Sequence, residues 1–268
     1  MTEISAALVK ELRDRTGAGM MDCKRALQDT NGDIEAAKRL LRERGMASAE
    51  KRAGRMTAEG KVGFRIADDG KRGTIVAVGC ETEPVSNNDE FLAYAKKVLE
   101  LVEQEGPGAE QQLEDERLAL SGKLGENIVV AGAARFEAVD SAVIDGYVHP
   151  PANKLGVLVQ VRGGSDELAR RVAMHVAASP GTRWIGREDV PEEIVTAERE
   201  IYANSDEVQS KPEQAREKIV DGMLNKRFFG ANVLLDQEWI HDSGKRVADA
   251  LSEESAEVLE FERFELSA

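Results

Sequence analysis

The spacing of apolar residues changes near residue 60, and this change limits the folds that the chain can adopt. In residues 4–45 apolar side chains recur every three or four positions, which is the period of an amphipathic helix. From residue 61 onward Val62, Phe64 and Ile66 alternate with polar or small residues, which is the period of a half-buried strand. Helical segments return later in the chain. The pattern therefore predicts an α+β fold with a helical part at the N-terminus.

The first 45 residues carry the signals for three short helices. Turn residues at 16–19 and 31–32 separate the helices, and Asp33 is a suitable N-cap for the third. Gly45 is expected to end this helix. Residues 46–60 show no strong apolar period and are expected to form a linker helix or a tether. The sequence therefore predicts a small three-helix bundle that is linked to a larger body.

The body is predicted to contain a β-hairpin followed by further helices and strands. Helices are expected near residues 91–102 and 109–124, and strands near 127–137, 142–149, 155–162 and 256–265. A weak repeat links the segment from Gly73 with the segment from Gly156, because each is a strand that leads into a helix with acidic residues in its first turn. The repeat reflects either two related α+β halves or chance.

Residues 191–229 interrupt the second of these halves. Pro191 and Pro212 suit the first positions of two helices, and the residues between 204 and 212 are turn-like. The segment is therefore predicted to form a protruding antiparallel helical hairpin.

The charge of the chain limits its ligands. Its 36 Lys and Arg residues stand against 50 Asp and Glu residues, a net charge of −14, so phosphate backbones and anionic membranes repel the protein as a whole. Cys23 and Cys80 form no CxxC pair, so neither a disulfide framework nor a thiolate zinc site is expected. No segment approaches the ~20 apolar residues that cross a bilayer. Both observations predict a cytoplasmic protein. Residues 1–55 alone carry a charge of +3. These basic side chains either solvate one helix face or dock on an acidic partner.

Motifs for catalysis are missing from the sequence. GxGxxG, GxxxxGK[ST], HExxH and GxSxG do not occur, so phosphate-binding loops, zinc hydrolysis and nucleophile elbows are not expected. His175 lies in an apolar helix and is expected to be a hydrogen-bonded packing residue. His149 precedes Pro150 at a strand end, an exposed position that suits a binding contact at least as well as catalysis. We expect no catalytic residue, metal site or cofactor.

Two short segments are unusual for residues that only build a fold. Met20 and Met21 follow a glycine-flanked turn and cannot both face a core, so at least one is expected to be exposed and able to adapt to a partner, unless it caps the small core. Residues 82–85, with the sequence Thr-Glu-Pro-Val, are expected to form a rigid loop tip that presents an acid with an apolar pair. A plain connection between a strand and a helix has the same appearance.

Residues 12–27 (LRDRTGAGMMDCKRAL) resemble, over their whole length, the N-terminal signature of the elongation factor Ts family. The resemblance continues at residues 31–34, 80–82, 124–128, 174–179 and 234–237, and so covers essentially the entire chain. It implies a ubiquitin-associated-like three-helix module at residues 1–52 and a core N-subdomain at 53–140. It also implies a core C-subdomain at 141–268 with a helical-hairpin (coiled-coil) insertion at about 188–230.

The resemblance implies a function that is not enzymatic. Members of the family bind elongation factor Tu·GDP and promote the exchange of GDP for GTP by displacing the Mg²⁺ ion and other nucleotide contacts. The positions that match the family's contacts are Arg13, Met20 and Met21 in the N-terminal module, Thr82, Glu83, Pro84 and Val85 in the core loop that enters the partner, and, more weakly, His149. The hairpin is a further candidate surface for homodimer formation.

The core loop departs from the family's usual Thr-Asp-Phe-Val. Glu83 keeps the carboxylate on a longer side chain, whereas Pro84 replaces an aromatic residue that would bury about 150–250 Å². Either the partner carries a complementary change, or Val85 and the rigidity of the loop contribute more. The alternative function is a non-enzymatic module that binds RNA or the ribosome through the basic head, with an affinity that falls steeply as salt increases.

Overall fold

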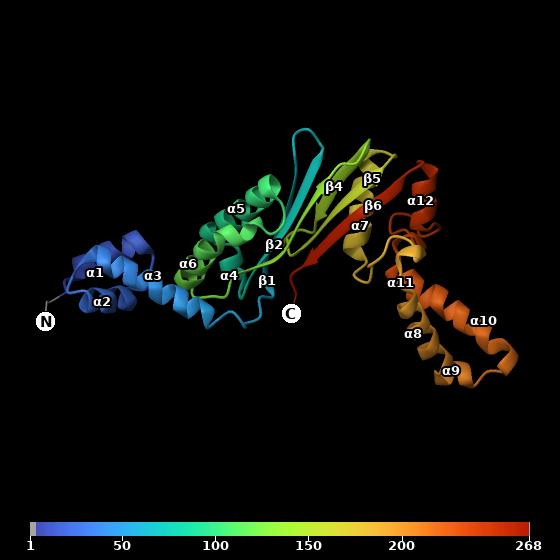
Figure 1. The fold of residues 1–268 in the computed structure, drawn as a ribbon, viewed down its shortest axis with the longest axis horizontal. Helices are drawn as coiled ribbons and strands as arrows, with labels where there is room; N and C mark the ends of the chain where they lie inside the picture. The colour runs from blue at the N-terminus through green and yellow to red at the C-terminus, as the bar shows by residue number, and fades with distance from the viewer. Residues whose placement is uncertain (1–3, 268) are drawn as a thin grey trace.

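The computed structural model describes residues 4–267 of the chain. Helices α1 (Ala6–Thr16), α2 (Met20–Asp29) and α3 (Ile34–Glu50) form a helical module at one end of an elongated molecule (Figure 1). The side chain of Asp33 accepts a hydrogen bond of 2.9 Å from the backbone N of Ala36, which confirms the predicted N-cap of α3. The apolar faces of the three helices meet in a small core that contains Val9, Leu12, Cys23, Ala26, Leu27 and Ala37.

The prediction that Gly45 ends the third helix is wrong, because α3 continues through this residue. Gly45 lies against Gly122 of helix α6 (Glu114–Leu124), and a Cβ atom at Gly122 would lie only 2.6 Å from the Cα atom of Gly45. The glycine therefore allows two helices to approach closely and docks the helical module on the body. Residues 51–58, called the tether below, then lead to the first strand.

The body contains two three-stranded antiparallel sheets. The first has the strand order β1 (Glu59–Ile66), β2 (Arg72–Cys80) and β3 (Val129–Glu137). The second has the order β4 (Ala142–Val148), β5 (Leu155–Arg162) and β6 (Glu257–Glu265). The helices between the strands are α4 (Glu83–Ser86), α5 (Asp89–Glu105), the 3-10 turn η1 (Ala109–Leu113) and α6 in the first half, and α7 (Asp166–Ala178) and α12 (Val247–Glu253) in the second.

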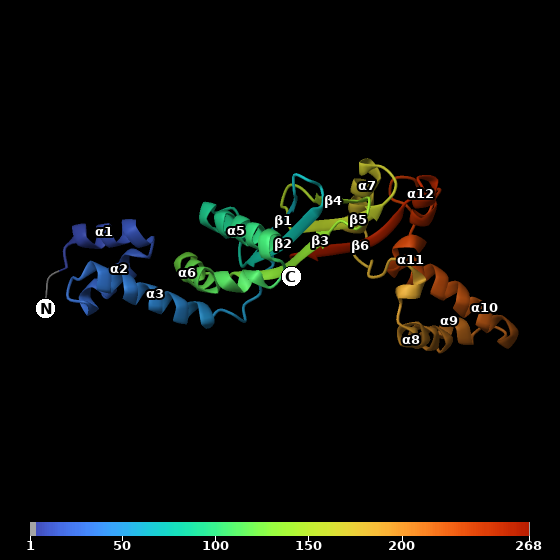
Figure 2. The ribbon, with the colours of Figure 1, turned by 45° about the horizontal axis from the view of Figure 1, so that its top comes forward.

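The two sheets pack against each other and helices cover their outer faces (Figures 1 and 2). Ile75 and Leu158 lie in the core between the sheets. Val76 and Val78 face α5 and α6, and Val159 faces α7 and α12. The central strands β2 and β5 are therefore buried on both faces, which explains their continuous apolar sequences. The fold is α+β, as the sequence predicts.

A helical hairpin projects from the end of the molecule opposite the helical module (Figure 1). It consists of α8 (Glu192–Ala203), α9 (Asp206–Gln209) and α10 (Glu213–Met223). The 3-10 turn η2 (Arg187–Asp189) leads into it, and the π-helix η3 (Leu224–Phe229), the short helix α11 (Gly230–Asn232) and the 3-10 turn η4 (Leu234–Asp236) lead back to the body. Pro191 and Pro212 are the N-caps of α8 and α10, one position before the predicted one. Within residues 4–267 no helix is both long and apolar enough to cross a membrane.

Candidate functional site

The connection between β2 and α5 is the first candidate site, and residues 81–87 are called the Thr82 turn below. Thr82 has an extended backbone, with φ −132°, and is followed by the one-turn helix α4 with Pro84 in its first turn. A proline is favourable there because its φ is already helical and no N–H partner is lost. The hydroxyl of Ser86 donates a hydrogen bond of 2.8 Å to the carbonyl oxygen of Glu83. The predicted loop tip is therefore a compact helical turn.

The side chains of this turn point in two directions. Thr82, Glu83 and Pro84 are exposed, whereas Val85 is partly buried and packs on the apolar cluster that contains Phe91. The expectation that Pro84 and Val85 are presented together is wrong, because Val85 turns toward this cluster while Pro84 stays exposed. The turn therefore offers one carboxylate and one apolar ring to a partner.

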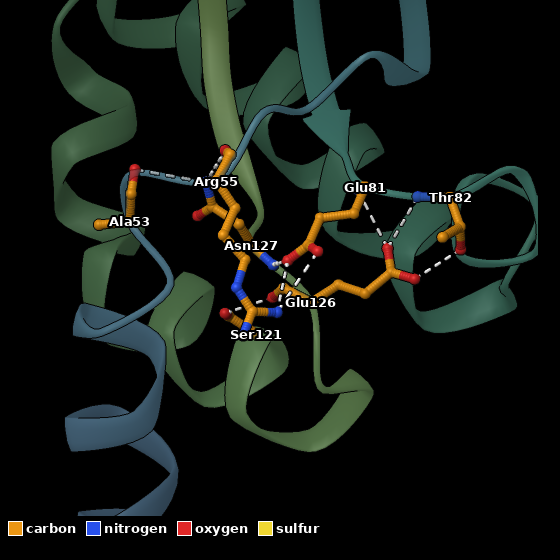
Figure 3. Close-up of polar contacts among 7 residues, drawn as sticks. All are labelled: Ala53, Arg55, Glu81, Thr82, Ser121, Glu126 and Asn127. Carbon is orange, nitrogen blue, oxygen red and sulfur yellow. Dashed lines mark hydrogen bonds and ion pairs between the residues drawn. The ribbon is translucent and has the colours of Figure 1, made fainter.

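Glu126 holds the Thr82 turn from the connection between α6 and β3. Its carboxylate accepts hydrogen bonds of 3.0 Å from the backbone N of Glu81 and of 3.0 Å from the backbone N of Thr82, and a third from the Thr82 hydroxyl (Figure 3). The hydroxyl of Ser121 in turn donates to the carbonyl oxygen of Glu126. Hydrogen bonds to a carboxylate are stronger than neutral ones, so this one side chain fixes the turn relative to α6.

The neighbouring residue, Asn127, holds the tether. Its side-chain amide donates to the carbonyl oxygens of Arg55 at 2.9 Å and of Ala53 at 3.4 Å, and its backbone N–H donates to the Glu81 carboxylate at 2.6 Å. The Glu81 carboxylate also lies 3.4 Å from the guanidinium of Arg55. Asn127 is 1% exposed, so water does not compete for these bonds. The tether, the Thr82 turn and the connection after α6 therefore meet at one cluster (Figure 3).

Cys80 supports the turn from below. Its Sγ donates a hydrogen bond of 3.3 Å to the carbonyl oxygen of Thr82. Burial and, to a smaller extent, the negative charge of Glu126 raise the pKa of the Cys80 thiol to about 12. A thiol with such a pKa stays protonated near neutral pH and is not a nucleophile. Cys80 is therefore a structural residue.

The second candidate site is the corner of the helical module where α1 meets α2. Met20 and Met21 open α2 and are 56% and 63% exposed, so both methionines face solvent where the sequence requires only one to do so. Arg13 lies in the last turn of α1 and is exposed. The short turn at residues 17–19 brings these two helix ends together.

The third candidate residue, His149, directly follows β4 and is exposed, as expected. Its Nδ1 lies 2.9 Å from the hydroxyl of Tyr147, which orients the ring. The loop that it begins is attached to β1, because Lys154 Nζ lies 2.9 Å from the carboxylate of Glu59. Glu59 is the ladder partner of Cys80, which ends β2. His149 therefore lies at the same end of the two sheets as the Thr82 turn.

His175 belongs to none of these sites. It is 1% exposed, its Nε2 lies 2.8 Å from Oε1 of Gln237, and its ring stacks on Trp239 with 5.1 Å between the ring centroids. Burial lowers the pKa of its imidazole. The prediction that it is a hydrogen-bonded packing residue is confirmed.

The structure thus joins some of the sequence candidates and separates others. The Thr82 turn and His149 share one end of the sheets, whereas the corner with Met20 and Met21 lies in the helical module, beyond α6 (Figures 1 and 2). Sequence patterns missed Glu126 and Asn127 as supporting residues. The available signal was a charged residue and an amide between Gly125 and the apolar strand, but their partners lie more than 40 positions away along the chain.

Known proteins match this chain over most of its length. A family model described as "Elongation factor TS" matches residues 81–268. The proteins named elongation factor Ts of Thioalkalivibrio sulfidiphilus and Photorhabdus laumondii are each 40% identical to this chain, over 98% and 99% of it and over 92% and 93% of their own lengths. The protein of the same name from Escherichia coli O139:H28 is 41% identical, over 99% of this chain and 92% of its own length. The chain therefore belongs to the elongation factor Ts family.

Proposed function

We propose that this protein is a guanine-nucleotide exchange factor for elongation factor Tu, and that the Thr82 turn is the part that weakens GDP binding. The observation that carries the proposal is the exposed carboxylate of Glu83 on a turn that is already fixed by Glu126. A segment that is ordered before binding loses little conformational entropy when it enters a partner. Most of the interaction energy of the turn is therefore available to stabilise a rearranged partner.

The exchange requires a difference in affinity between states of the partner. GDP and Mg²⁺ hold the partner in one arrangement, and a factor that binds the nucleotide-free arrangement more tightly must weaken the nucleotide. An inserted acidic turn disfavours the phosphate oxygens by charge repulsion and competes for the contacts of the metal. No covalent bond is made or broken in this process. The protein is therefore proposed to act as a binding partner and not as an enzyme.

The corner formed by Arg13, Met20 and Met21 is proposed to dock the helical module on the same partner. Exposed methionines adapt their shape to an apolar surface, and their burial contributes roughly 25 cal/mol for each Å² removed from water. Arg13 adds a positive charge for an acidic surface. His149, at the end of the sheets that carries the Thr82 turn, is proposed as an additional contact. Docking by the module would raise the affinity, while the turn changes the nucleotide site.

The orientation of Val85 bears on the missing aromatic residue at position 84. Val85 packs on the body's own core, so it cannot also replace the lost aromatic contact without leaving that core. Rigidity of the turn remains as a compensating factor, since Glu126 and Cys80 both hold Thr82. We propose that Glu83 and the exposed ring of Pro84 enter the partner on a preformed turn.

The test is the release of fluorescent GDP from the cognate elongation factor Tu, followed by stopped flow. We expect micromolar protein to accelerate release strongly, and the Glu83→Ala variant to lose most of this acceleration. Glu167→Ala is the matched control, because Glu167 is an exposed acid in the first turn of α7, the corresponding helix of the second half. If the unaltered protein did not accelerate GDP release, the proposal would be wrong. If both variants lost the same share of the acceleration, Glu83 would have no special role.

A further inference from the structure

We infer that Glu126 and Asn127 are positioning residues with separate tasks: Glu126 sets the Thr82 turn for nucleotide release, and Asn127 sets the tether for docking of the helical module. The inference rests on the proposed exchange function. Neither residue has to touch the partner. Their side chains reach two different segments from adjacent positions on one connection.

The contacts of Glu126 are directed at the start of the turn. Its carboxylate receives both backbone N–H groups of Glu81 and Thr82 and the Thr82 hydroxyl, so the backbone that leads into α4 is held at three points. Thr82 makes no side-chain cap to α4, because its hydroxyl is directed to Glu126 instead. The base of this clamp is itself held by Ser121 and by the left-handed C-cap Gly125, with φ +78°. Loss of the carboxylate frees the turn and leaves its exposed side chains, Glu83 and Pro84, unaltered.

The contacts of Asn127 are directed at the tether. Two carbonyl oxygens of the tether, from Ala53 and Arg55, accept hydrogen bonds from one buried amide. The tether is the covalent link between α3 and β1, and α3 also contacts α6 through Gly45. Asn127 therefore fixes the tether, which is the second attachment of the helical module to the body beside the contact of α3 with α6. Releasing it increases the range of module orientations and lowers the effective concentration of the module at its docking surface.

Glu81 lies between the Thr82 turn and the tether, and its contacts show which bonds each substitution would remove. Its carboxylate accepts the Asn127 N–H at 2.6 Å and faces Arg55 of the tether, while its own N–H is bound by Glu126. An Asn127→Ala substitution removes only the side-chain amide and keeps its backbone bond to Glu81. A Glu126→Ala substitution removes the clamp on the turn and keeps both bonds between Asn127 and the tether.

The experiment measures GDP release from elongation factor Tu as a function of the concentration of the exchange protein. We expect Glu126→Ala to lower the maximal release rate about tenfold with a half-saturating concentration that changes less than about twofold. We expect Asn127→Ala to raise the half-saturating concentration about five- to tenfold with a maximal rate that stays within about twofold. Glu126→Gln keeps an acceptor for the two N–H groups and should restore the maximal rate to within about threefold of the unaltered protein.

A merely structural role predicts a different pattern. If both variants reduced the rate in proportion to a loss of folded protein, measured by circular dichroism and thermal unfolding, the inference would be overturned. Equal changes of both kinetic constants in the two variants would also overturn it. Hydrogen exchange gives a readout that does not depend on the partner: the amides of Glu81 and Thr82 should lose protection in Glu126→Ala while the amides of α5 keep theirs. If the unaltered protein failed to accelerate GDP release, the proposed function would fall, and hydrogen exchange would still decide whether Glu126 holds the turn.

Discussion

The two halves of the body use the same scaffold. In each half a central strand, β2 or β5, is buried on both faces and leads into the helix that covers its outer side. The ladder irregularities fall between Ala77 and Val78 in one half and between Gln160 and Val161 in the other, at the same step of the sequence repeat. These coincidences favour two related halves over chance.

The halves differ in the connection from the central strand to the helix. In the second half Gly163 and Gly164, each with φ +70°, lead directly to the N-cap Ser165. In the first half the Thr82 turn occupies this place and reaches the N-cap Asn88 only after the extra helix α4. The scaffold therefore does not need the turn, since its counterpart folds without one. The Thr82 turn is therefore an exposed addition to a scaffold that both halves share, which favours a role in binding over a role in folding.

The largest effect is expected where the halves meet. Ile75 and Leu158 occupy equivalent positions of the repeat, and both are fully buried between the sheets. A Cβ atom at Gly73 would lie 3.2 Å from Leu158 Cδ1, and one at Gly156 would lie 3.4 Å from Ile75 Cδ1, so the packing is nearly reciprocal. We expect Ile75→Ala and Leu158→Ala each to lower the free energy of unfolding by about 2–5 kcal/mol, measured by urea denaturation. A large loss in only one variant would break the equivalence of the halves.

The next effect concerns the two helix caps. Asn88 Oδ1 accepts hydrogen bonds from the backbone N of Glu90 at 2.9 Å and of Phe91 at 3.4 Å, and Ser165 Oγ accepts one from Leu168 at 3.2 Å. We expect Asn88→Ala and Ser165→Ala each to cost about 1 kcal/mol of stability. Only Asn88→Ala should also slow GDP release, because Asn88 borders the Thr82 turn. If the rate of GDP release were the same with both variants, the Asn88 cap would have no part in nucleotide exchange.

A pH effect just below neutrality is expected from the second half, where His175 is buried. Burial lowers the pKa of His175 in the folded protein, so between this pKa and the unfolded value of about 6.5 only the unfolded chain binds the proton. Stability from the neutral imidazole is therefore present above about pH 6.5 and is lost as the pH falls below it. We expect the urea midpoint to fall more steeply between pH 7 and pH 5.5 in the unaltered protein than in His175→Gln. Parallel curves would show that His175 does not titrate on unfolding.

The sequence predicts what depends on neighbouring residues and misses what depends on distant ones. The helices, the strand order along the chain and the Asp33 cap follow from local patterns. Gly45 has the local pattern of a helix stop, but its role comes from Gly122, which no local pattern reveals. The division into three domains at residues 52 and 140 stays a prediction.

The candidate site shows the same limit. The resemblance selects Thr82 and its neighbours, whereas α4 is shorter than the span over which a helical period can be recognised. The inward direction of Val85 and the clamp by Glu126 both depend on contacts with other elements. The sequence therefore selects the segment of the candidate site, and the tertiary contacts decide which of its side chains are exposed.

The smallest effect on stability is expected at Pro84, which is an exposed residue of α4, the helix that the second half lacks. Pro84 packs on no apolar cluster within residues 4–267, so Pro84→Ala should change the free energy of unfolding by less than about 0.5 kcal/mol. Its ring is the one apolar group that the turn presents, and its fixed φ limits the conformations of the turn before binding. We therefore expect Pro84→Ala to slow GDP release about two- to threefold, and Pro84→Phe, which restores a large apolar surface, to accelerate it. If elongation factor Tu released GDP at the unaltered rate with both variants, position 84 would make no contact with the partner. Glu83 and the backbone held by Glu126 would then suffice for exchange.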